Sequence, residues 1–174
     1  MRHFVTLLLP FRPIATAILI ILLLANCSKD DVNNCREGKC TYEFYDDTQL
    51  SITEEGDWRQ LELEHGPWIV FKYEYQYDDE ENIADDELTE ILYFQIPAES
   101  TSYQIDLRTY VMQTVYFNRL CYCGKTGFEF PNEAIINCEK INDDTWHVTV
   151  DLSIDYYETG QPIQLNFEAD FTKN

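Results

Sequence analysis

Cysteines are the residues of this sequence whose types and spacing most clearly allow chemistry, and there are six of them. Cys35 and Cys40 are close enough in sequence to close a small disulfide loop. Cys121 and Cys123 are two positions apart, so on a strand both point to the same face, and one of them is available for Cys138. We predict the disulfides Cys35–Cys40 and Cys121–Cys138 with one free cysteine, although the sequence does not fix the connectivity or which cysteine is free.

A metal site is the alternative use of the later cysteines, with His147 as a further ligand. The Cys-x-Cys spacing lacks a second matching pair, and structural zinc sites show tighter knuckle spacing. The sequence therefore favours disulfides, and we predict neither a metal nor another cofactor.

Groups that could act as catalytic bases are few. His65 lies in an expected turn and His147 lies on the polar side of an expected strand. The sequence has no nucleophile elbow, phosphate loop, metalloprotease helix or dinucleotide fingerprint. With 32 Asp and Glu residues, some carboxylate pair will always lie at the separation that glycoside hydrolysis needs. We therefore predict that the protein is not an enzyme, and a small glycan hydrolase is the alternative from another class.

Tyr73, Tyr75 and Tyr77 share one face of an expected strand over residues 68–77. Such a stripe can form part of a core or a platform for sugar rings, and core is the commoner use. The acidic run at residues 78–87 lacks the ligand spacing and the glycine of a known calcium loop, so we expect a solvated loop there. The three tyrosines are a speculative binding site.

Alternating apolar and polar residues, rich in Tyr, Phe, Val and Ile, recur along the rest of the chain. Helix is an alternative only near residues 85–93. About eight such strands with regular spacing predict a single antiparallel all-β domain, a sandwich or a small barrel. The segments in which these strands are expected lie at residues 41–45, 49–53, 59–64, 68–77, 88–96, 103–107, 110–122, 134–138, 146–156 and 163–171.

The net charge of −20 excludes one class of partner. Nucleic-acid binding needs clustered Lys and Arg to contact phosphates, so we expect no nucleic acid. An acidic body is also repelled by anionic headgroups, so any membrane attachment must come from a lipid rather than from the protein surface.

An apolar run at residues 14–25 ends at Cys27, and charge follows at once. The run is shorter than the roughly 20 residues that cross a bilayer, and Arg2 and Arg12 give it the basic start of a signal peptide. The tetrapeptide at 24–27 resembles the lipobox of bacterial lipoproteins, with Asn26 where that family has Gly, Ala or Ser. Residues 28–31 resemble the export signal of Bacteroidota surface lipoproteins.

This resemblance implies a cleaved signal peptide at 1–26, a lipidated polar tether at 27–40 and the all-β domain at 41–174. Cys27 is then the lipid-attachment residue, and the protein lies at the outer membrane, facing the cell surface. We expect a non-enzymatic binding domain whose ligand, a protein or a glycan, the sequence does not identify. The alternative is a periplasm-facing acidic inhibitor or partner protein.

Overall fold

The computed structural model describes residues 35, 38–55, 58–77, 88–109, 114–120, 127–155 and 162–174. Within these residues the chain forms strands and no helix, which confirms the all-β prediction. The strands are β1 (Lys39–Tyr45), β2 (Thr48–Glu55), β3 (Trp58–His65), β4 (Trp68–Gln76), β5 (Thr89–Pro97), β6 (Ser102–Asp106), β7 (Val115–Leu120), β8 (Glu133–Asn142), β9 (Thr145–Ile154) and β10 (Ile163–Lys173).

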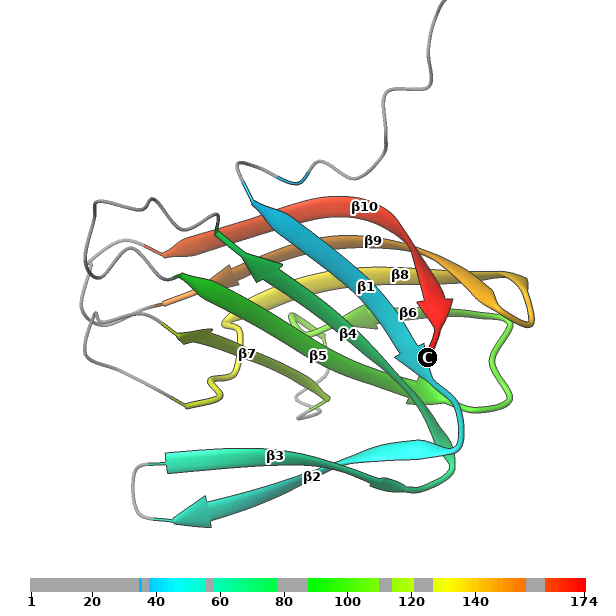
Figure 1. Ribbon diagram of the computed structural model, residues 1–174, viewed down its shortest axis with the longest axis horizontal. Helices are drawn as coiled ribbons and strands as arrows, with labels where there is room; N and C mark the ends of the chain where they lie inside the picture. The colour runs from blue at the N-terminus through cyan, green and yellow to red at the C-terminus, as the bar shows by residue number, and fades with distance from the viewer. Residues whose placement is uncertain are drawn as a thin grey trace, which may run out of the picture. The chain divides into compact units, whose positions relative to one another are not determined.

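Eight of these strands form one curled sheet with the shape of a half-barrel (Figure 1). Their order is β6-β8-β9-β10-β1-β4-β5-β7. One junction departs from the antiparallel expectation, because β1 and β10 run parallel. These strands lie at opposite ends of the domain sequence, so no tight turn between them fixes their relative direction.

The core lies between the two halves of this sheet, where side chains on alternate positions of facing strands meet. Phe71 of β4 lies edge-on to Trp146 of β9, with ring centroids 5.6 Å apart, and edge-on to Phe171 of β10 at 5.5 Å. All three rings are fully buried. Burial of a large apolar side chain contributes about 2–3 kcal/mol, so this contact between halves is a principal source of stability.

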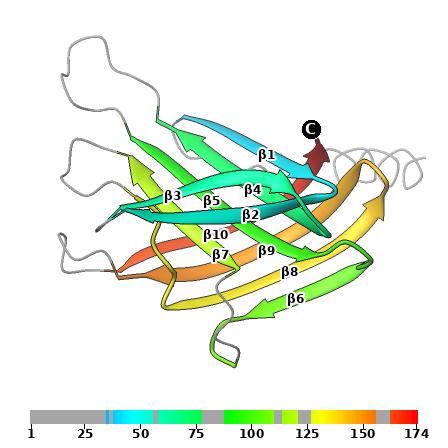
Figure 2. The ribbon, with the colours of Figure 1, turned by 90° about the horizontal axis from the view of Figure 1, so that it is seen from below.

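The remaining strands, β2 and β3, form a hairpin that lies across the outer face of β4 and β5 (Figure 2). The backbone N–H of Leu50 donates a hydrogen bond to Oε1 of Gln95 in β5, at 2.8 Å. Val70 alternates with the core residues of β4 and points outward, yet it is fully buried. The hairpin thus accounts for the burial of Val70 on the outer face of β4.

A tight turn separates the strands expected at residues 41–45 and 49–53, and Asp47 adopts a left-handed backbone conformation in it (φ 50°). The two strands that the turn joins do not pair with each other. Strand β1 pairs with β4 in the large sheet, whereas β2 pairs with β3. The turn therefore carries the chain from one sheet to the other.

Candidate binding pocket at one end of the half-barrel

A pocket of about 550 Å³ opens at the end of the half-barrel where β10 begins and β4 ends. Its described lining comes from five strands and the residues next to them: Tyr42, Tyr73, Tyr75, Tyr77, Leu88, Glu90, Arg119, Ile163, Gln164, Leu165, Asn166 and Phe167. Three of these, Tyr73, Tyr75 and Tyr77, are the residues that we named from the sequence as a speculative binding site.

The pocket exists because β1 is shorter than β10. Their parallel register pairs Glu43 with Thr172, which brings Lys39, the first residue of β1, opposite Glu168. Residues 163–167 of β10 therefore extend beyond the start of β1. The pocket lies between this extension and the end of β4.

Aromatic rings from three strands form one wall of the pocket. Tyr73 stacks on Phe167 with ring centroids 4.6 Å apart, and Tyr42 lies 5.5 Å from Tyr73 and 5.6 Å from Phe167. Tyr73 and Tyr75 are 5% and 7% exposed, so they belong to the core as well as to the pocket. Because the sheet curls toward this face, the tyrosines line a hollow rather than an open platform.

An ion pair between β5 and β7 forms another part of the pocket wall. Glu90 and Arg119 are register partners, and Nε of Arg119 donates to Oε1 of Glu90 at 3.0 Å. Nη2 of Arg119 donates to the same oxygen. The Glu90 side chain is only 10% exposed. Among the described residues, Oε2 of Glu90 has no hydrogen-bond partner.

Sequence reasoning missed both members of this pair, although one signal was available. Positions 90, 92, 94 and 96 of β5 point to the inside of the half-barrel, and position 90 alone among them is charged. A carboxylate is costly in such a place unless it is paired, so its presence indicates a partner or a function.

The pocket offers chemistry suited to recognition. Burial raises the pKa of Tyr42, so its phenol stays protonated and can donate a hydrogen bond. The ion pair adds a carboxylate oxygen as an acceptor. Glu90 is the one carboxylate among the described lining residues, whereas glycoside hydrolysis uses two.

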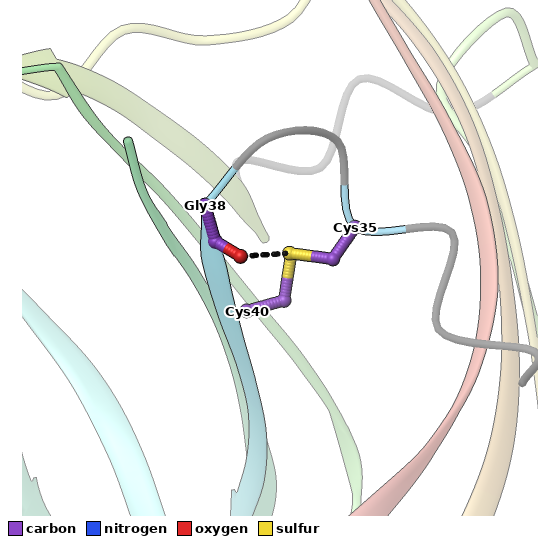
Figure 3. Close-up of a disulfide and its surroundings, with 3 residues drawn as sticks. All are labelled: Cys35, Gly38 and Cys40. Carbon is purple, nitrogen blue, oxygen red and sulfur yellow. Dashed lines mark hydrogen bonds between the residues drawn. A yellow bond between two sulfur atoms is a disulfide. The ribbon is translucent and has the colours of Figure 1, made fainter. Parts of the chain in front are cut away.

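The predicted Cys35–Cys40 disulfide is present, with the two Cα atoms 5.8 Å apart (Figure 3). Sγ of Cys35 lies 3.6 Å from the carbonyl oxygen of Gly38 within the loop. Gly38 has φ 145°, and a Cβ there would collide with the carbonyl oxygen of Gln76 and lie 2.7 Å from Cε2 of Tyr75. The loop therefore holds the start of β1 against the pocket wall.

The predicted Cys121–Cys138 disulfide is wrong, because Cys138 is a free thiol. Cys138 points into the core from β8 and is 3% exposed, and burial raises its pKa to about 12. Strand β8 lies beside the edge strand β6, whereas β7, which ends at Leu120, is the edge strand at the opposite end of the sheet order. Cys121 and Cys123 lie outside the described residues, as do Cys27 and the acidic run at 78–87.

The structure does not bring His147 and Cys138 together as metal ligands. Cys138 faces the core, whereas His147 lies on the outer face between Asp170, at 2.8 Å, and Glu168, at 3.1 Å. Those carboxylates raise the pKa of His147. In the part of the chain that the structure describes, no cluster of three or more His, Cys, Asp or Glu residues could hold a metal ion.

Over the same described ranges, no helix is long and apolar enough to cross a bilayer. Comparisons with protein-family models, with curated proteins and with solved structures find no match for this chain.

Proposed function

We propose that this chain is an outer-membrane lipoprotein, anchored through Cys27 and displayed at the cell surface, whose β domain binds a ligand in the pocket between β10 and β4. It acts by binding and not as an enzyme. The observation that carries the proposal is the Glu90 carboxylate in the pocket wall.

This carboxylate occupies a position where folding alone favours an apolar side chain. Replacing a buried ion pair with apolar residues of similar volume is often neutral or stabilising, so stability does not account for the pair. Departures from the local pattern of a fold are expected at functional sites. A buried acceptor in the same pocket as the protonated phenol of Tyr42 is consistent with such a site.

Anchoring is supported by the junction at Cys27 and by the nearby disulfide. Disulfides persist in exported proteins, and Cys35–Cys40 follows Cys27 closely. Acyl chains contribute about 0.8 kcal/mol for each buried methylene, so several chains on Cys27 would hold an acidic domain at a membrane that its surface does not attract.

Metabolic labelling with palmitate tests the anchor. The wild-type chain should take up label and the Cys27→Ala variant should not, and label that persists in the variant would refute lipidation at Cys27. Protease added to intact cells tests display. A chain that is cleaved only after lysis would face the periplasm.

Binding in the pocket is testable with the chain that begins at Ser28, because the whole core cluster lies within residues 35–171. Nile red, a neutral dye whose fluorescence rises in apolar surroundings, is a suitable probe. Ile163→Trp fills the pocket and should abolish the signal, whereas Leu63→Trp, at an exposed site on the hairpin, should preserve it. Equal signals from the two variants would place the binding site elsewhere.

A further inference from the structure

We infer that the ligand of this pocket is a neutral saccharide. The inference rests on the proposed function, since it takes the pocket between β10 and β4 as a binding site and assigns the chemical class of its ligand. Three properties of the described lining lead to it: charge balance, an open acceptor and an aromatic wall.

Charge balance argues for a neutral ligand. Glu90 and Arg119 are the charged residues of the described lining, and they neutralise each other. The described lining therefore carries no net charge, because its two charged groups have opposite signs and are paired. A wall of balanced charge attracts neither an anion nor a cation strongly, so it suits a neutral ligand.

The hydrogen-bond acceptor that Glu90 leaves available indicates that the ligand carries hydroxyl groups. Nε and Nη2 of Arg119 both donate to Oε1 of Glu90, and within the described residues Oε2 accepts no hydrogen bond. A wholly apolar ligand would cover Oε2 and leave it unsatisfied, at the cost of its desolvation. A ligand hydroxyl can donate to Oε2 without disturbing the ion pair.

The aromatic wall indicates that the hydroxyl groups of the ligand belong to a ring that also has an apolar face. The rings of Tyr42, Tyr73 and Phe167 pack against one another in the pocket wall. A pyranose presents C–H groups on its faces and hydroxyls at its edge, which matches one apolar wall and one polar wall. The volume of about 550 Å³ also suits a small saccharide, because ligand pockets span roughly 300–1,000 Å³.

The test is a titration of the chain from Ser28, followed by backbone amide NMR. The neutral probes are maltose, lactose and diacetylchitobiose; glucuronate is the charged probe, and Nile red is the apolar probe. We expect at least one neutral disaccharide to shift the amides of Glu90 and residues 163–167 saturably. Glucuronate should bind at least about tenfold more weakly than that disaccharide.

Two variants test the role of the acceptor. Glu90→Gln keeps the shape of the side chain and should weaken disaccharide binding at least about tenfold. Asp106→Asn removes a partly exposed carboxylate that is also paired with an arginine but is not among the pocket-lining residues, and should leave binding unchanged. Ile163→Trp, which keeps the ion pair, should abolish binding even if the Glu90 variant does not fold.

The outcomes separate this inference from the proposed function. If Nile red binds in the pocket and none of the neutral disaccharides does, the saccharide inference is overturned and the binding site stands. If neither the dye nor any sugar shifts the pocket amides, both are overturned. Stronger binding of glucuronate than of every neutral sugar would also overturn the inference.

Discussion

Replacing Arg119 with Met should destabilise the fold through the charge that it leaves behind. The Glu90 side chain is 10% exposed and the Arg119 side chain is 22% exposed, so the carboxylate would lose its ionic partner while it stays buried. Breaking a buried pair in this way costs about 3–5 kcal/mol. Since the pocket admits some water, we expect the lower end, about 3 kcal/mol.

Glu90→Leu alone and the double variant should each lower the free energy of unfolding less than Arg119→Met does. Glu90→Leu leaves an arginine whose long side chain can turn its guanidinium toward the pocket mouth, so we expect a loss of about 1 kcal/mol. The double variant Glu90→Leu/Arg119→Met replaces the pair with apolar groups and should lie within about 1 kcal/mol of the wild type.

Urea denaturation followed by intrinsic fluorescence gives these differences as free energies of unfolding. Arg108→Met, which breaks an exposed pair with Asp106, is the matched control and should show no measurable change. If the double variant is as unstable as Arg119→Met alone, the pair is needed for folding. The main argument that Glu90 serves binding would then fail.

Three further changes test other parts of the structure. The raised pKa of His147 means that its protonated form stabilises the fold below about pH 6.5 and that this contribution is lost as the pH rises through the folded pKa. His147→Gln should thus lower the melting temperature more at about pH 5.5 than at about pH 9, and equal losses would contradict this. Replacing Cys35 and Cys40 with Ser should lower the free energy of unfolding by about 2 kcal/mol, as expected for a short loop, and urea curves that match the wild type would contradict it. Cys138 should resist alkylation in the native state and react after unfolding, as measured by peptide mapping, whereas a disulfide-linked Cys138 peptide would refute the free thiol.

Much of the fold could be predicted because strand alternation is a local property. The period of two identifies the inward residues of β4, β9 and β10, and the same residues form the core. Strand pairing depends on contacts between distant residues, and local patterns do not encode them. The parallel contact of β1 with β10 and the separate β2–β3 hairpin were therefore missed.

The site was predictable only in part, for the same reason. The sequence places Tyr73, Tyr75 and Tyr77 on one face, but the curl of the sheet, which is set by tertiary packing, decides that this face lines a hollow. Glu90 and Arg119 are distant in sequence and meet only because β5 and β7 are neighbours. The disulfide at Cys35 was predictable because its loop is short.

A crystal structure of the chain from Ser28 with the best-binding neutral disaccharide tests the central claim most directly. We expect a sugar ring in the pocket against Tyr73 and Phe167, with one hydroxyl within hydrogen-bonding distance of Oε2 of Glu90. Sugar bound elsewhere on the domain, with only water in the pocket, would contradict the account.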